Sequence, residues 1–288
     1  MQAFLITAYK NQNQLVKLIH SLNKHALVFV HIDKKSTELN LQELNSLGLE
    51  NTQFISKYNI PWGGYTHLLA ILDLFKMALG DERVSYIHTI SGQDIRIKPW
   101  EYIEDHFRTC ENIYMTCFDS KDLPQGIKKR YTQRIVTSRG TCIRKHIERL
   151  NRFYQKVQNK LHISWSTIKP FDDVYKGVIW CSMPRHAAEY ALDFSKKNPV
   201  FLRTLKHVSL PEEFFFQTIF MMSDYRQHVI KENLRFTDWT KRNGSKPAIL
   251  DETDFDSVIQ SNCIFARKID EDISNELIKK VDAYLEGR

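Results

Sequence analysis

The sequence lacks the long apolar runs of a membrane protein. Hydrophobic residues make up 42% of its 288 positions, yet no run approaches the ~18–20 apolar residues that a spanning helix needs. The first residues, MQAFLITAYKNQ, are apolar only briefly and have no basic stretch before them, so we interpret them as a buried strand and not as a signal peptide. We therefore expect a cytoplasmic location, with peripheral contact at the inner face of the cytoplasmic membrane left open.

Cysteine is sparse and metal-binding motifs are missing. The cysteines are odd in number, scattered and without C-x-x-C spacing: Cys110, Cys117, Cys142, Cys181 and Cys263. We expect most of them to be buried small apolar residues. The sequence has no H-E-x-x-H, P-loop, G-x-S-x-G or G-x-G-x-x-G motif. It also has no Asp-x-Asp at a strand end, the pattern that holds a divalent ion under a sugar nucleotide. From these absences we predict that the protein has no metal site and no cofactor.

Apolar runs and helical spacings alternate along the chain. Strands are expected at residues 3–8, 26–32, 53–56, 85–90 and 177–182. Helices are expected at residues 15–22, 66–80 and 184–196, at the apolar run that Pro211 opens, and at the carboxyl terminus, where Ile278, Val281 and Leu285 share one face. Thr66 is a plausible N-cap for the second of these helices. Strands that alternate with helices predict an α/β protein with a mostly parallel, doubly wound sheet.

Polar residues follow three of the expected strands. They are Thr7-Ala8-Tyr9, the run from His31 to Ser36, and Ser91-Gly92-Gln93-Asp94. In open α/β sheets, ligands bind outside the carboxyl ends of the strands. Polar loops occur at this edge in every such domain, so the pattern alone predicts only that a ligand, such as a nucleotide, binds here.

The net charge of +7 comes from one segment. Between Lys128 and Lys160 there are eleven Lys or Arg residues and a single acid, Glu148, so this segment carries +10 while the other 255 residues sum to −3. The apolar residues within it recur at helical spacing: Ile143, Ile147, Leu150, Phe153, Tyr154, Val157 and Leu161. This predicts an amphipathic helix with a cationic outer side. A solvated helix face, an anionic membrane and nucleic-acid phosphate are the three interpretations left open.

Two further clusters carry chemistry. Glu212 and Glu213 precede three phenylalanines, so one of the two acids is expected to point inward, where aromatic walls raise a carboxyl pKa and suit it to general-base work. The plainer interpretation is a helix start that favours acids. Arg267 and Lys268 adjoin apolar residues, which favours either a bound diphosphate or an ion pair with Asp270 or Glu271.

The ordered blocks resemble a known family. They are VHIDKKS, WGGYTHLLAILDLFKMAL, YIHTISGQDIRIKPWEYIEDHF, GVIWCSMPRHAAEYAL, LPEEFFFQTI, LRFTDW and FARKID. In this order they resemble the core-2/I-branching glycosyltransferases, which include β-1,6-N-acetylglucosaminyltransferases and peptide O-xylosyltransferases. Without an anchor or paired cysteines, the chain is similar to the short bacterial members. The acid block is P-E-E here where relatives have P-D-E, and Tyr9 stands where the first strand of relatives often ends in His.

The resemblance implies a GT-A-type fold and an inverting, metal-independent transfer of a sugar from a UDP-sugar, with N-acetylglucosamine as the first candidate, to a hydroxyl of a glycan or glycolipid. It implies that Glu213 is the general base and that Lys268 contacts the diphosphate in place of a metal, with Lys246, Arg267 or Arg242 as the second cation. The other residues that it assigns to the donor are Thr7, Ala8, Asp33, Tyr65 and Asp94. Those assigned to the acceptor are Trp180, Ser182, Glu212 and Trp239.

We therefore expect one domain over residues 1–288. Residues 1–120 form its nucleotide-binding half, residues 121–170 a basic helical insertion, and residues 171–288 its acceptor and catalytic half. Expected partners are a UDP-sugar, a glycan or glycolipid acceptor and, through the basic segment, an anionic membrane. The alternative is a nucleic-acid-binding protein, or a sugar transferase that acts on modified DNA, although no aromatic interleaving or nucleic-acid motif accompanies the charge.

Overall fold

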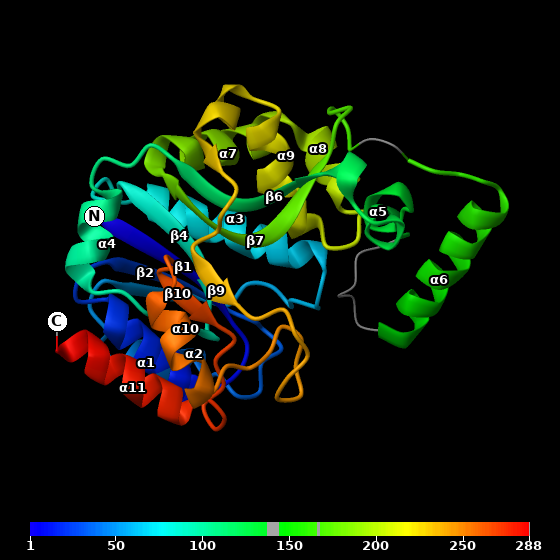
Figure 1. Ribbon diagram of the computed structural model, residues 1–288. Coiled ribbons are helices and arrows are strands. Elements are labelled where there is room, and N and C mark those ends of the chain that lie inside the picture. The colour runs from blue at the N-terminus through cyan, green and yellow to red at the C-terminus, as the bar shows by residue number, and fades with distance from the viewer. Residues whose placement is uncertain (137–143, 166–167, 288) are drawn as a thin grey trace.

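The computed structural model describes residues 1–136, 144–165 and 168–287 (Figure 1). The strands are β1 (Gln2–Ala8), β2 (Leu27–Ile32), β3 (Thr52–Ile55), β4 (Tyr86–Ser91), β5 (Asp94–Arg96), β6 (Ile113–Asp119), β7 (Tyr175–Pro184), β8 (Val229–Ile230), β9 (Arg235–Thr237) and β10 (Phe265–Arg267). The α-helices are α1 (Gln12–Leu22), α2 (Leu41–Ser46), α3 (Tyr65–Leu79), α4 (Trp100–Phe107), α5 (Gln125–Thr132), α6 (Arg144–Lys160), α7 (Arg185–Lys197), α8 (Pro199–Leu205), α9 (Phe215–Met221), α10 (Phe255–Gln260) and α11 (Asn275–Glu286).

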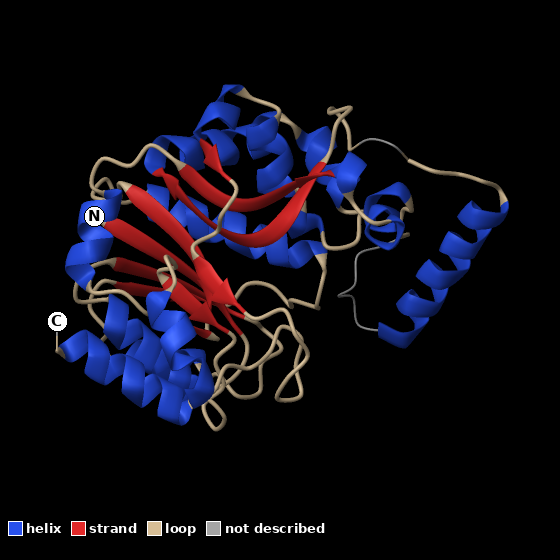
Figure 2. Ribbon diagram, in the orientation of Figure 1, coloured by secondary structure: helices blue, strands red, loops and turns tan. Residues whose placement is uncertain are grey.

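A seven-stranded sheet forms the centre of the molecule, in the order β3-β2-β1-β4-β7-β6-β8 (Figure 2). Strands β3, β2, β1 and β4 are parallel, β7 runs antiparallel to both β4 and β6, and β8 is parallel to β6. A smaller sheet, β5-β10-β9, lies beside it. The predicted α/β class, with a mostly parallel sheet flanked by helices, is confirmed.

Helices cover both faces of the large sheet, so its central strands are buried on both sides. Along β1, Ala3 and Leu5 pack into one core with α3, α7 and α9, while Phe4 and Ile6 pack into a second core with α1 and α4. A strand buried on both faces is apolar at every position instead of alternating. This is why the first strand could be recognised as a short apolar run.

Two local predictions differ from the structure. Helix α3 begins at Tyr65 with Gly64 as its N-cap, so Thr66 is not the cap; its hydroxyl instead donates to the carbonyl oxygen of Asn59 at 2.7 Å. The acid pair does not open the apolar helix. It lies in a separate 3₁₀ turn, Pro211–Glu213, and α9 begins at Phe215. A 3₁₀ turn advances by about 120° per residue, so the two adjacent acids point in different directions.

Arg235, on β9, ties the two sheets together. Its guanidinium donates to the hydroxyl of Ser182 at 2.7 Å and to the carbonyl oxygens of Thr89 at 2.9 Å, Cys181 at 3.0 Å and Asn233. The side chain is buried, so water cannot replace these partners. A single cation surrounded by carbonyl oxygens therefore fixes the small sheet against β4 and β7.

The segment expected to be a basic insertion lies between β6 and β7 and projects from the body of the molecule (Figure 1). Helix α6 leaves several apolar residues exposed, although Tyr154 and Val157 are partly buried. Leu150, Phe153 and Leu161 are exposed, whereas Asn151 and Gln158 are buried. The expected apolar inner side is therefore wrong, because side-chain amides make the attachment: Asn151 accepts from the Val136 amide at 2.9 Å. Ile143 lies outside the described residues.

Across the described residues, no helix is both long enough and apolar enough to span a membrane. Cys117 and Cys181 are buried as expected, and Cys110 and Cys263 are partly buried. Burial raises the pKa of the Cys117 thiol to about 12 and that of Cys181 to about 11, which makes both unreactive at neutral pH. Cys142 lies outside the described residues.

Candidate functional site

Three neighbouring parallel strands end together, as the sequence predicted. Thr7 is in register with His31 on β2 and with Ser91 on β4. Just beyond, the Asp33 amide donates to the carbonyl oxygen of Ala8 at 2.8 Å. The Asp33 carboxylate accepts from the amides of Lys35 at 3.2 Å and Ile60 at 3.0 Å, so it organises the loop after β2. The predicted donor residues Thr7, Ala8 and Asp33 therefore lie at one edge of the sheet.

A histidine that the sequence analysis did not assign connects this edge to the acid pair. His67, in the first turn of α3, places Nε2 3.3 Å from the Thr7 hydroxyl and Nδ1 3.5 Å from a carboxylate oxygen of Glu212. Glu212 is almost fully buried, and its Oε2 has no hydrogen-bond partner in the structure. Glu212 thus faces the strand ends, and His67 sits between the donor edge and the 3₁₀ turn.

Glu213 points elsewhere and meets two cations. Its Oε2 lies 2.7 Å from Nζ of Lys176, on β7, and 2.9 Å from a guanidinium nitrogen of Arg130, on α5. Burial raises the pKa of Glu213, with the neighbouring Glu212 adding to the rise, while Lys176 and Arg130 oppose it. The side chain keeps a fifth of its surface exposed. It is therefore a carboxylate of raised pKa that a substrate can reach, as a general base requires.

Glycine allows the close approach that brings Lys176 to Glu213. A Cβ on Gly177 would lie 1.7 Å from the carbonyl oxygen of Thr116, across the irregular pairing of β6 with β7. The 3₁₀ turn that carries Glu213 is held from the other side, where the Leu210 amide donates to the Gly63 carbonyl oxygen at 3.3 Å. Both Gly63 and Leu210 have positive φ. Glycine accepts positive φ readily, whereas leucine adopts it only when its surroundings impose it.

Cations also gather near the end of β10. The Arg267 guanidinium lies 4.2 Å from the ring centre of Trp180 and 3.5 Å from the Asp94 carboxylate. Asp94 is buried and also accepts from the amide and hydroxyl of Ser91 at 2.7 and 2.5 Å. The carboxylate partner of Arg267 is therefore Asp94 and not Asp270 or Glu271, so that predicted pairing is wrong. Arg267 and Asp94 form one buried charged pair beside the donor edge.

Lys268 is the more available of the two adjacent cations. Its Nζ lies 3.2 Å from the Ser245 hydroxyl. Burial lowers its pKa, and the positive charges of Arg267 and Lys10 lower it further. Lys10 is another residue that the sequence analysis missed; it pairs with Asp270 at 3.0 Å. Positive charges that lower the pKa of a neighbouring lysine favour binding of an anion between them.

The remaining candidates fall into different surroundings. Lys246 is exposed, and Tyr65 is partly buried, which raises its pKa. Arg242 is held by Asp251 at 2.6 Å and Asp254 at 2.5 Å, so it is not an available second diphosphate cation.

The four predicted acceptor residues do not form one group. Trp239 is exposed, Trp180 is partly buried beneath Arg267, and Glu212 is buried beside His67. Ser182 is fully buried, with its hydroxyl bonded to His88 at 2.8 Å and to Arg235. No substrate reaches it there, so its predicted acceptor role is wrong; the position is constrained because its hydroxyl is a partner of the buried Arg235.

Within the described ranges of the chain, no three His, Cys, Asp or Glu side chains are grouped so that they could hold a metal ion.

Comparison with curated proteins finds xylosyltransferases. The chain is similar to xylosyltransferase 1 of Mus musculus, with 24% identity over 97% of this chain and 30% of the relative. It is similar to xylosyltransferase of Ciona intestinalis, with 24% identity over 97% and 33%, and to xylosyltransferase sqv-6 of Caenorhabditis briggsae, with 21% identity over 84% and 29%. The chain thus spans about a third of the length of these relatives.

The fold is also similar to the solved structure of S. aureus TarS 1–349, with 14% identity, 72% of this chain and 54% of that chain covered, and a TM-score of 0.32. For the complex of TarS 1–349 with UDP, the identity is 13%, the coverage 71% and 54%, and the TM-score 0.33. The family comparison covers far more of the sequence: the Core-2/I-Branching enzyme model matches residues 2–259. That match includes the strand ends, His67, Lys176 and the acid pair, and by it the chain belongs to the Core-2/I-Branching enzyme family.

Proposed function

We propose that this chain is an inverting glycosyltransferase with a GT-A-type fold that moves a sugar from a UDP-sugar to a hydroxyl of a glycan or glycolipid. The observation that carries the proposal is the placement of Glu213. It is a buried carboxylate of raised pKa, partly open to solvent, and it adjoins the Glu212–His67–Thr7 line that leads to the ends of the parallel strands. The family match supports the same class of reaction.

The proposed step is a single displacement. Glu213 takes the proton of the acceptor hydroxyl as that oxygen bonds to C1 of the sugar, and the bond from C1 to the diphosphate oxygen breaks, so the configuration at C1 inverts. UDP leaves with both electrons of that bond. Lys268, helped by the neighbouring Arg267, stabilises the charge that develops on the diphosphate. Because these cations supply the charge, no metal takes part in the proposed reaction.

Lys176 and Arg130 have a second part in this scheme. Both contact the carboxylate of Glu213, and both favour its ionised form, which is the form that accepts a proton. Burial alone would keep the group protonated at higher pH. The net effect of burial and the two opposing cations is a raised pKa, so Glu213 is a stronger base than an ordinary glutamate.

The test compares the two adjacent acids. Glu213→Gln keeps the shape of the side chain but removes the basic oxygen, so we expect turnover to fall by ~10²–10⁴-fold with the affinity for UDP unchanged. Glu212→Gln is the matched control, and we expect it to reduce stability or cause a modest loss of activity. Transfer that persists in Glu213→Gln and disappears in Glu212→Gln would contradict the assignment.

The same assay tests the metal. Transfer, or hydrolysis of the donor when no acceptor is present, should survive EDTA, and Lys268→Met should reduce it in the presence or absence of manganese. Activity that EDTA abolishes and manganese restores would show that the diphosphate is not held by Lys268 and its neighbours.

Donor identity is best found by a thermal-shift screen of UDP and UDP-sugars. A ligand at ~100 times its dissociation constant stabilises the folded state by ~2.7 kcal/mol, which is readily detected. N-acetylglucosamine is the first sugar to test. Xylose is the second, because the curated relatives are named as xylosyltransferases.

We also propose that α6 contacts an anionic membrane peripherally, at the cytoplasmic face. On this helix the exposed apolar residues Leu150 and Phe153 share one stripe, and the exposed Leu161 follows directly after the helix. An adjoining stripe, also exposed, is basic and consists of Arg149, Arg152, Lys156 and Lys160. Apolar and basic stripes side by side suit the boundary between headgroups and acyl chains, where each basic residue contributes ~1 kcal/mol.

Vesicle flotation across a salt series tests this contact. Reversing Arg149, Arg152 and Lys156 to Glu should reduce binding to vesicles of phosphatidylglycerol and phosphatidylcholine, while UDP binding is retained. Equal binding to purely phosphatidylcholine vesicles, or a gel shift with DNA at lower protein concentration than flotation requires, would contradict the membrane assignment, and the second result would favour the nucleic-acid alternative.

A further inference from the structure

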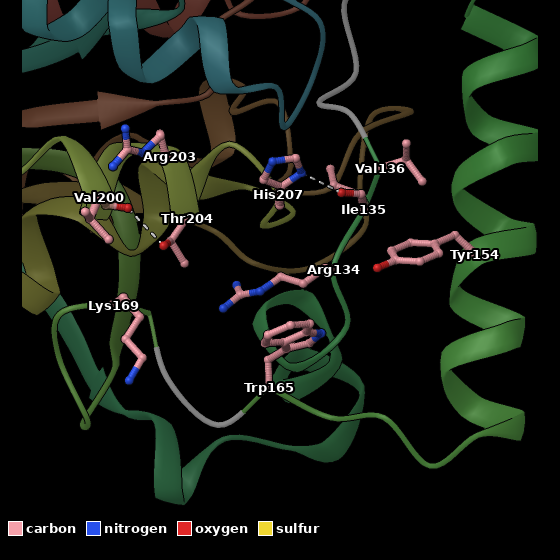
Figure 3. Close-up of a pocket in the computed structure, with 10 residues that line it drawn as sticks. All are labelled: Arg134, Ile135, Val136, Tyr154, Trp165, Lys169, Val200, Arg203, Thr204 and His207. Atoms are coloured by element: carbon pink, nitrogen blue, oxygen red, sulfur yellow. Dashed lines mark hydrogen bonds between the residues drawn. The ribbon is translucent and has the colours of Figure 1, made fainter.

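A cavity of about 690 Å³ lies apart from the residues assigned to sugar transfer. It is bounded by the chain that follows α5, by α6 and by α8 (Figure 3). Figure 3 shows the Arg134 side chain extending between Trp165 and α8, while the hydroxyl of Tyr154 points towards it from α6. The cavity is large enough for one or two sugar rings.

Positive charge dominates this cavity. Arg134, Lys169 and Arg203 line it, and none of the described residues that line it is acidic. Within the described ranges, neither Lys169 nor Arg203 takes part in an ion pair. Burial also lowers the pKa of Arg134 to about 10, because its guanidinium is poorly solvated, so a bound anion would stabilise the charged form. A hollow whose described lining is basic and contains no acidic side chain favours an anionic ligand.

The cavity walls are held in place by hydrogen bonds. The Gln158 side chain, which is buried, accepts from the Arg134 amide at 3.0 Å and donates to the Arg134 carbonyl oxygen at 2.8 Å. On the opposite side, the Ile135 amide donates to the His207 carbonyl oxygen at 2.9 Å. The backbone of Arg134 is therefore fixed, so its side chain extends from a defined position, as a preorganised binding site requires.

Two aromatic side chains, Tyr154 and Trp165, line the cavity, and Trp165 is the more exposed of them. Arg134 lies 5.5 Å from the ring centre of Trp165, yet 45% of the Trp165 surface remains exposed. An exposed indole presents an apolar face with a polar edge, and such a surface packs well against the C–H face of a sugar ring.

The cavity adjoins the proposed base by two short stretches of chain. Arg130, which contacts Glu213, lies four residues before Arg134, and His207 lies shortly before the acid turn. The two stretches are joined where the Ser209 amide donates to the Arg130 carbonyl oxygen at 3.0 Å. A chain-like ligand in the cavity can therefore continue towards Glu213.

We propose that this cavity binds an acidic sugar of the acceptor, one that carries a phosphate or a carboxylate, beside the unit whose hydroxyl is glycosylated. The inference rests on the proposed function, because it identifies the cavity as part of the acceptor site. The anionic group lies among Arg134, Lys169 and Arg203, and the sugar ring packs on Trp165. The acceptor class is thus an acidic glycan, not a neutral one.

The test measures binding to the full chain by isothermal titration with glucose 6-phosphate, trigalacturonate and neutral maltotriose. These ligands separate phosphate from carboxylate and both from an uncharged sugar. The variant Lys169→Glu/Arg203→Glu changes only exposed side chains. Its matched control is Lys196→Glu/Lys197→Glu on α7, which changes the net charge equally on an exposed surface outside the cavity.

At least one acidic sugar should bind the unaltered chain at least tenfold more tightly than maltotriose. The cavity variant should lose at least tenfold in that affinity, the control less than threefold, and UDP binding should be equal in all three proteins. Binding of maltotriose equal to that of both acidic sugars, no loss in the cavity variant, or tighter binding of a DNA 10-mer would overturn the inference. Failure of the unaltered chain to bind UDP would instead contradict the proposed function. The sugar titrations would still decide whether the cavity binds an acidic sugar.

Discussion

The central sheet and the insertion between β6 and β7 bury opposite kinds of side chain. In the sheet, apolar residues of β1 face two cores, and the buried Arg235 is surrounded by carbonyl oxygens from three segments. In α6, the amides Asn151 and Gln158 are buried, while Leu150 and Phe153 face solvent. The helical spacing of apolar residues is as clear in α6 as in the helices that flank the sheet. Amphipathicity therefore identifies a helix, but it does not say which side of the helix meets the rest of the protein.

The two regions should differ most in how much stability is lost when one arginine is replaced in each. Arg235→Met removes the donor from two buried carbonyl oxygens, the partly buried Asn233 carbonyl oxygen and the buried Ser182 hydroxyl, and each unsatisfied buried group costs ~1–3 kcal/mol. We expect the free energy of unfolding, measured with urea, to fall by about 3–4 kcal/mol. The matched control is Arg152→Met on α6, which is exposed and should change stability by less than about 0.5 kcal/mol. Equal losses would mean that Arg235 does not join the two sheets.

A smaller effect, on the pH dependence of activity, is expected at Glu213, which contacts Lys176 of the sheet and Arg130 of the insertion. Lys176→Met removes a cation that favours the ionised carboxylate, so the pKa of Glu213 should rise further. The acidic limb of the kcat/KM profile should therefore move to higher pH by about one unit, with activity at pH 8–9 less affected than activity at pH 6. Lys121→Met, which removes an exposed partner of Asp173, is the control and should leave the limb in place. An unchanged limb in Lys176→Met would contradict Glu213 as the titrating base.

The smallest effect is expected on the apolar stripe of the insertion. Phe153 is 66% exposed, so Phe153→Ala should change the free energy of unfolding by less than about 0.5 kcal/mol. Phe75→Ala, at a buried position on α3, should cost about 3–5 kcal/mol. Chemical denaturation of both variants measures the contrast. A loss of more than about 1.5 kcal/mol in Phe153→Ala would show that this face of α6 packs against the protein.

Sequence reasoning located the buried strands because both of their faces are apolar, and it located the edge where three parallel strands end because polar residues follow Ala8, Ile32 and Ile90 directly. The three-residue strands β5, β9 and β10 are too short to give a periodic signal. The buried side of α6 was missed because Asn151 and Gln158 satisfy irregular backbone near residues 134–136, and such backbone leaves no apolar pattern.

The candidate site was predicted unevenly for a related reason. Glu213 and Lys268 could be assigned from family blocks, since each lies within a recognisable local motif. His67, Lys176 and Arg130 act through contacts with residues distant in sequence, and the sequence offered no local sign of those pairings. Ser182 fits the family block, but its hydroxyl serves Arg235 inside the sheet. A matching residue type therefore located a constrained position without revealing what constrains it.

The pairing of β6 with β7 has a consequence for how this enzyme could diversify. Asp119 and Tyr175 face each other across two adjacent antiparallel strands, so everything between them leaves and re-enters the sheet at nearly the same place. Closing a longer or shorter loop between two fixed points changes the entropy only slowly with length. The whole module could thus be exchanged for another without unfolding the scaffold. Yet Arg130 belongs to that module and touches Glu213, so a replacement without a cation at this place would leave Lys176 as the remaining cation of the pair.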